Sequence, residues 1–175
     1  MRFALLSFLA IAPLLAQDVK FPPEIDKLSA KATEVVDVSL DGAMLRLAGR
    51  FLSNRDPDEA RVKSVLNGLK GIYVKSFEFD KPGEYSPSDL DDIRRQLRGP
   101  GWSRMVGVLS RKSGDNAEIY MKLDDDHIGG LVILAAEPKE LTVVDIVGSI
   151  SLEDLSALGG HFGIPDVEVG KEHRK

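Results

Sequence analysis

The densest set of potential metal ligands in the sequence is Asp124–His127, a run of three aspartates and a histidine. Carboxylate and imidazole groups both bind metals, so this run could hold a divalent ion. A calcium-binding loop places its oxygen ligands at alternate positions and ends in a glutamate, and that spacing is missing here. Aspartates are also favoured in turns, where they bond the local backbone and stay hydrated. The run therefore predicts a hairpin turn and no metal site.

Other residue types that could carry catalysis do not form a catalytic pattern. The chain has no cysteine, which excludes a thiol nucleophile, a disulfide and a cysteine-ligated zinc. No serine lies in a Gly-x-Ser-x-Gly elbow. The glycine-rich run Gly159–Gly163 follows a predicted helix, whereas a phosphate-binding loop opens one. We expect no catalytic residue, no cofactor and a non-catalytic function, with a hydrolytic enzyme as the less favoured alternative.

The composition indicates a globular protein that does not bind nucleic acid. Of the 175 residues, 43% are hydrophobic and 29% are charged, which fits one domain rather than a disordered chain. The net charge is −5, whereas a non-specific nucleic-acid binder needs a basic surface. We expect residues 17–160 to form a single domain and residues 161–175 to form a flexible tail.

The first sixteen residues have the features of a signal peptide. Arg2 provides the positive start, Phe3–Ile11 is an uncharged apolar run, and Ala16 is the small residue before the cut. The apolar run is shorter than the ~20 residues that span a bilayer. We expect cleavage between Ala16 and Gln17, and a mature protein in the periplasm or outside the cell. With no cysteine to carry a lipid, we expect no lipid anchor and no membrane span after cleavage.

Helices are predicted early in the chain and consecutive strands late. Capping and apolar spacing predict helices after Pro23, from Gly42, from Asp56 to Gly71, from Ser86 to Gly99 and after Ser151. The predicted strands are Thr33–Leu40, Gly71–Asp80, Trp102–Arg111, Ala117–Leu123, Ile128–Ala136 and Leu141–Ile150. Short connections make neighbouring strands antiparallel. The predicted class is α+β, a largely antiparallel sheet of about five or six strands with helices packed mainly on one face.

Two of these elements have patterns that predict which side chains are buried. The helix from Gly42 has one apolar stripe, which we expect to face the core: Met44, Leu45, Ala48, Phe51 and Leu52. The strand Ala117–Leu123 alternates apolar and polar residues, which predicts that Glu118, Tyr120 and Lys122 face water.

The strand Gly71–Asp80 carries large apolar side chains on both of its faces. Ile72 and Val74 share one parity, and Tyr73, Phe77 and Phe79 share the other, unless a bulge shifts the phase. Helices could cover the second face and make these residues core. If they do not, the face is an interaction surface, because monomers seldom expose large apolar areas. We take Tyr73, Phe77 and Phe79 as the candidate surface for a protein partner or a second copy. A small apolar ligand carried between sheet and helices is the alternative.

Four segments of the chain resemble a known family. They are strand-and-turn patterns without a catalytic signature: Gly68–Val74, Trp102–Val106, Ile128–Leu134, and Val144–Ile150 with the helix after it. From about Leu28 to Leu158 the chain resembles the exported bacterial domains catalogued as the domain of unknown function numbered four thousand two hundred and fifty-two. The resemblance implies a small periplasmic or secreted protein, in some cases found beside regulators of envelope stress, and brings no functional residue. We expect an interaction or regulatory module of the cell envelope.

Overall fold

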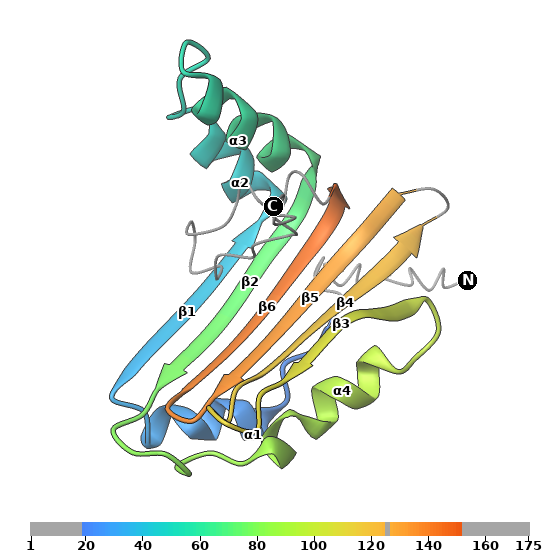
Figure 1. Ribbon diagram of the computed structural model, residues 1–175. Helices are drawn as coiled ribbons and strands as arrows, with labels where there is room; N and C mark the ends of the chain where they lie inside the picture. Colours follow the sequence, from blue (N-terminus) through green and yellow to red (C-terminus); the bar gives the residue numbers. More distant parts are fainter. Residues whose placement is uncertain (1–18, 125–126, 152–175) are drawn as a thin grey trace, which may run out of the picture.

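The computed structural model describes residues 19–124 and 127–151. Within these ranges the chain forms one six-stranded sheet with four short α-helices and two 3-10 turns (Figure 1). The predicted signal peptide with its cleavage site at Ala16–Gln17, the predicted helix after Ser151 and the predicted tail 161–175 lie outside the described residues.

Every neighbouring pair of strands in the sheet is antiparallel, and the spatial order is β1-β2-β6-β5-β4-β3. The strands are β1 (Glu34–Asp41), β2 (Leu69–Glu78), β3 (Trp102–Leu109), β4 (Asn116–Asp124), β5 (His127–Glu137) and β6 (Glu140–Ile150). The last four strands follow one another through hairpins, whereas β2 lies between β1 and β6. The predicted α+β class with an antiparallel sheet is confirmed, and β1 and β3 are its edges.

The helices begin near the predicted positions, and two helical segments follow the predicted caps Asp56 and Ser86. They are α1 (Pro23–Asp26) with the 3-10 turn η1 (Lys27–Ala30), α2 (Gly42–Gly49), α3 (Pro57–Gly68), and the 3-10 turn η2 (Pro87–Leu90) leading into α4 (Asp91–Leu97). Asp56 caps α3 by accepting from the backbone N–H groups of Asp58 and Glu59. Helix α3 ends at Gly68 rather than the predicted Gly71, because Leu69 already pairs with Gly148 of β6.

Two apolar cores lie on opposite faces of the sheet. One contains residues of α1, η1, η2 and α4 with Phe77 of β2 and Phe79 just after it, and the other contains residues of α2 and α3 with Ile72 and Val74 of β2. Phe77 points to the face opposite that of Ile72 and Val74, because side chains alternate along a strand. In Figure 1 helices α2 and α3 lie at one end of β1 and β2, and α1 and α4 lie at the opposite end of the sheet. Helices therefore contribute to both faces rather than mainly to one.

The residues of the candidate interaction surface lie inside the protein. Tyr73, Phe77 and Phe79 are 6%, 1% and 2% exposed. Phe77 and Phe79 pack with side chains of α1 and α4, and the Phe79 ring stacks on Tyr85 at 5.3 Å between centroids. No register shift separates Val74 from Phe77, so both faces of β2 are buried and no bulge lies between them. The expectation of an exposed surface here is therefore corrected, since helices cover Phe77 and Phe79, and Tyr73 is also buried.

Candidate functional site

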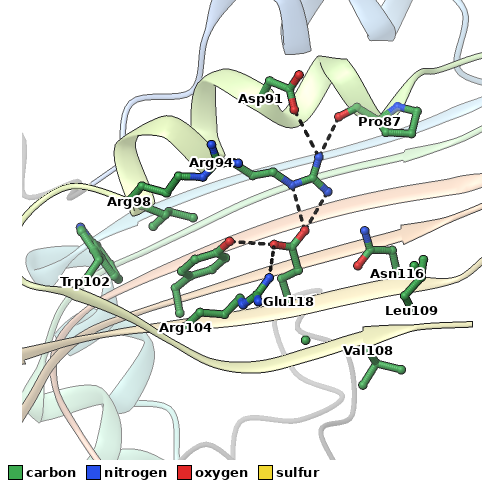
Figure 2. A pocket seen from close by; sticks show the side chains of 13 residues that line it. Pro87, Asp91, Arg94, Arg98, Trp102, Arg104, Val108, Leu109, Asn116 and Glu118 are labelled. Carbon is green, nitrogen blue, oxygen red and sulfur yellow. Dashed lines mark hydrogen bonds and ion pairs between the residues drawn. The ribbon is translucent and has the colours of Figure 1, made fainter.

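A groove of about 850 Å³ lies between α4 and the strands β3 and β4 (Figure 2). Its floor is formed by Glu118 and Tyr120 of β4. Arg98 at the end of α4 and Arg104 of β3 line it with exposed side chains, and Trp102 is half-buried. The groove opens toward the edge of the sheet, because β3 is the outermost strand on this side.

A nearly buried ion pair joins α4 to the floor of the groove. Glu118 Oε1 accepts a hydrogen bond from Arg94 Nε at 2.9 Å and lies 2.7 Å from Arg94 Nη2. The two side chains are only 8% and 12% exposed. Figure 2 shows the Arg94 guanidinium reaching down from α4 to this carboxylate. A pair as shielded as this is screened far less by salt than a surface pair.

The second oxygen of Glu118 is bonded within the sheet. The Tyr120 hydroxyl donates to Glu118 Oε2 at 2.7 Å, which is possible because residues two apart on a strand share a face. Arg104 pairs with Tyr120 in the β3–β4 register, and its Nη1 lies 3.9 Å from the same oxygen. Both carboxylate oxygens of Glu118 therefore have donors. The Arg104 guanidinium is held at the mouth of the groove.

Helix α4 is held at a defined height above the strands. A capping box formed by Ser86 and Asp89 starts η2, which leads directly into the helix. The buried side chains Leu90, Ile93 and Leu97 fix its inner face. Arg94 Nη1 also donates to the Pro87 carbonyl at 2.9 Å. The Arg94 guanidinium is thus oriented by the Glu118 carboxylate on one side and by the Pro87 carbonyl on the other.

The network sets the protonation states of its members. Burial alone raises the pKa of Glu118, but hydrogen bonds from Tyr120 and Arg94 and the Arg94 charge outweigh it, so the pKa lies below its usual value. The pKa of Tyr120 is raised, first by burial and then by its bond to the carboxylate. At neutral pH Glu118 is ionised and Tyr120 is neutral. A carboxylate with a low pKa and occupied oxygens is a weak base, so the network is suited to structural support rather than proton transfer.

The edge strand beside the groove is exposed along nearly its whole length. Met105, Val106, Val108 and Leu109 are 51%, 41%, 53% and 66% exposed. Only one residue of β3, Arg104, carries a charge. The opposite edge strand, β1, carries Glu34, Asp37 and Asp41. Charges on an edge strand discourage pairing with other chains, so β3 is the less protected of the two edges.

A family model described as Domain of unknown function (DUF4252) matches residues 29–158. The chain belongs to this family. The match covers α4, β3 and β4, and therefore every residue of the groove. No curated protein and no solved structure matches the chain.

The DUF4252 chain forms the predicted hairpin at Asp124–His127, where Asp124 pairs with His127 between β4 and β5. Residues 125 and 126 lie outside the description. Among the described residues no group of three or more histidine, cysteine, aspartate or glutamate side chains could hold a metal ion. In the same part of the chain, no helix combines the length and the apolar character needed to cross a membrane.

The sequence did not identify the residues of the groove. Its alternation placed Glu118 and Tyr120 on the wet face of β4, but they are 6% and 5% exposed, whereas Leu123 is 56% exposed. The prediction was wrong because α4 covers this face and supplies Arg94, which makes burial of a carboxylate tolerable. One signal was present: Arg94 adjoins the stripe of Leu90, Ile93 and Leu97, so it must lie near the helix–sheet contact.

Proposed function

We propose that this DUF4252 protein is a non-catalytic interaction module of the cell envelope, which binds a partner along the edge of β3. The partner adds an extended segment to this edge and places an acidic side chain in the groove. The observation that carries the proposal is the exposed, apolar and almost uncharged β3 strand directly beside a groove with two exposed arginines.

The first support comes from the chemistry of a free strand edge. An edge strand presents backbone N–H and C=O groups that can pair with another extended chain. Exposed side chains on both faces of β3 provide apolar contacts: Val106 and Val108 on one face and Leu109 on the other. Backbone pairing would supply affinity, and the side chains beside it would supply specificity.

The second support is the charge of the groove. Arg94 neutralises Glu118, so the floor contributes little net charge. Arg98 forms no ion pair within the described residues, and Arg104 makes only the 3.9 Å contact with Glu118. These two guanidinium groups favour carboxylates, with which arginine forms paired hydrogen bonds.

An irregularity limits where a partner strand can pair. The register between β3 and β4 shifts between Arg104 and Val106, which places Met105 in a bulge. Bulges disturb pairing locally. The regular stretch after it, Val106–Leu109, is therefore the part of the edge that we expect to pair, with Arg104 next to its start.

The groove gives less support to the two alternatives. A carrier of a small apolar ligand would need an enclosed apolar cavity, whereas this groove is open and its floor contains the Arg94–Glu118 ion pair. A hydrolase would need an available base or nucleophile, whereas Glu118 is already bonded at both oxygens.

The proposal is tested by site-specific photocrosslinking in native envelopes. A photoreactive residue replaces Val108 on β3 and, as the matched control, Val35 on β1, which is 42% exposed. We expect a defined crosslinked partner from position 108 and none from position 35. Arg104→Glu should reduce the yield at position 108, because it repels an acidic segment, whereas Arg95→Glu on the exposed side of α4 should not.

Two results would contradict the proposal. Equal crosslinking from both edges would mean that β3 has no special role. A crosslinked product with the mass of two copies of this chain would show that β3 pairs with a second copy and not with an acidic partner.

A further inference from the structure

Helix α2 exposes a stripe of large apolar side chains on the side away from the sheet. Met44, Leu47 and Phe51 are 50%, 53% and 84% exposed. They are three and four residues apart, so they lie on one face of the helix and its final turn. The turn continues past the helix end, since Phe51 N–H bonds the Ala48 carbonyl. The sequence predicted Met44 and Phe51 on the buried side, and this prediction was wrong.

The inward face of the helix explains why the stripe must face out. Leu45 is fully buried in the core beside Val65 and Leu66 of α3. Leu45, Ala48 and Leu52 pack where α2 and α3 meet the sheet. The other large apolar side chains of this segment, Met44, Leu47 and Phe51, are exposed. Figure 1 shows α2 and α3 as a hairpin of helices that extends beyond the end of β1 and β2. The exposed stripe is thus carried on a projecting part of the molecule.

Arginines flank the exposed stripe. Arg46 and Arg50 lie beside Ala43 and Leu47 around a shallow depression on the outer side of α2. Neither arginine forms an ion pair with the described residues, and both are exposed. Helix α2 itself contains no acidic residue. Across α2 and α3, from Gly42 to Gly68, basic residues outnumber acidic ones five to three, although the whole chain has a net charge of −5.

We propose that this stripe, Met44, Leu47 and Phe51 with Arg46 and Arg50, docks the protein on an anionic lipid surface. Amphipathic helices bind in this way by placing apolar side chains at the boundary of headgroups and acyl chains while basic side chains contact phosphates. A projecting aromatic side chain flanked by unpaired arginines fits that geometry. The proposal is independent of the β3 groove, which shares no residue with the stripe.

The acidic character of the rest of the protein defines how the binding behaves. With a net charge of −5 the chain as a whole is repelled by an anionic membrane at long range, so the local arginines and the inserted side chains must supply the affinity. Binding is therefore reversible, weakened by salt and dependent on both components. A single short helix gives much weaker attachment than a transmembrane segment.

The experiment measures co-sedimentation with lipid vesicles. The protein is expressed from residue 17, which retains every described residue and removes the apolar leader that would itself bind lipid. Vesicles of phosphatidylcholine alone are compared with vesicles that also contain phosphatidylglycerol. We expect binding to the anionic vesicles only. Phe51→Ser should lower the partition constant about tenfold, the effect of losing one large buried apolar side chain.

Matched controls separate the stripe from general surface changes. Leu47→Ser should weaken binding, whereas Leu123→Ser on β4, at 56% exposure, should not. Arg46→Glu with Arg50→Glu should abolish binding to anionic vesicles. Arg111→Glu with Lys112→Glu makes the same change in net charge at the β3–β4 hairpin and should leave most of the binding intact. Circular dichroism confirms that each variant is folded.

Three results would overturn the proposal. Equal partition to neutral and anionic vesicles would mean that the arginines have no role in binding. No partition to either kind of vesicle at low salt would mean that the stripe does not bind a lipid surface. Concentration-dependent dimerisation that Phe51→Ser abolishes would assign the stripe to a second copy instead. None of these results bears on the β3 crosslinks, so the two proposals fail separately.

Discussion

At the scale of single residues, the carboxylate of Glu118 illustrates how a charge can be buried in a small domain. Removing a carboxylate from water is unfavourable unless donors replace the water. Arg94 and Tyr120 provide those donors, at 2.7–2.9 Å. The same contacts connect α4 to β4 across the floor of the groove, so the stability of the pair and the shape of the groove depend on one ionised group.

This arrangement predicts a pH-dependent effect of Glu118→Gln. The pKa of Glu118 is lowered in the folded protein, so its contribution is present above the unfolded pKa of about 4.3 and is lost as the pH falls through the folded value. At pH 7 the substitution should lower the free energy of unfolding by about 2 kcal/mol, a typical value for hydrogen bonds to a charged group. Urea unfolding at pH 7 and at lower pH should show this difference shrinking with acidification.

The control is Glu24→Gln. Glu24 forms only an exposed pair with Lys27 at 3.7 Å, so its substitution should change stability by less than about 0.5 kcal/mol at pH 7. A Glu118→Gln difference that stays constant with pH would mean that packing, not charge, accounts for it.

At the scale of elements, the sequence predicted which segments are helices and strands better than it predicted their inward faces. All six strands were predicted within a few residues, because β-branched runs between turn residues are strong local signals. On α2 the prediction was wrong for Met44 and Phe51, and on β4 it was wrong for Glu118 and Tyr120. Both depend on which element packs on top: α3 selects Leu45 on α2, and α4 buries Glu118 on β4.

The candidate site was harder to predict because its members are far apart in the chain. Arg94 and Glu118 are 24 residues apart and belong to different kinds of element. Neither has a distinctive spacing relative to the other, so only the packing of α4 on the sheet shows that they pair. The exposure of β3 could not be predicted either. It depends on the position of β3 at the edge of the sheet, which is set by the order of the strands and not by the local sequence.

A register shift between β2 and β6 makes Gly148 the most constrained glycine in the described sheet. Its φ is 128°, and a Cβ atom there would lie 2.7 Å from the Leu69 Cα and 2.8 Å from the Gly68 carbonyl oxygen. Gly148→Ala should therefore lower stability by about 3 kcal/mol, through backbone strain and overpacking together. Chemical denaturation measures the loss.

Gly83 is the matched control for backbone strain alone. Its φ is 85°, but a Cβ atom there would meet nothing within 4 Å. Gly83→Ala should lower stability by only about 1 kcal/mol. Equal losses at the two positions would show that the close approach of β2 to Gly148 does not matter.

At the scale of the whole molecule, the first described residues bind the sheet to α4. Val19 is fully buried, and its N–H donates to Asp145 Oδ2 in β6 at 3.1 Å. Lys20 forms two hydrogen bonds with the Gln96 side chain of α4, through its N–H at 3.0 Å and its carbonyl at 2.8 Å. Residues adjacent in sequence thus contact an inner strand and a helix that are far away along the chain.

Cleavage between Ala16 and Gln17 stays a prediction, and it would leave the contacts of Val19 and Lys20 intact. We predict that the exported protein has an intact mass that lacks residues 1–16.

We also predict that a chain starting at Gln17 is fully stable, whereas one starting at Pro22 is less stable by about 3–5 kcal/mol. The shorter chain loses a buried valine and the backbone donor to a buried carboxylate. Urea unfolding of both chains gives the difference. A chain starting at Asp18 is the control, because it keeps Val19 with its amide N–H and should resemble the longer one. If the chain starting at Pro22 were as stable as the others, these contacts would contribute nothing to the fold, and the position of the cleavage site would have no structural consequence.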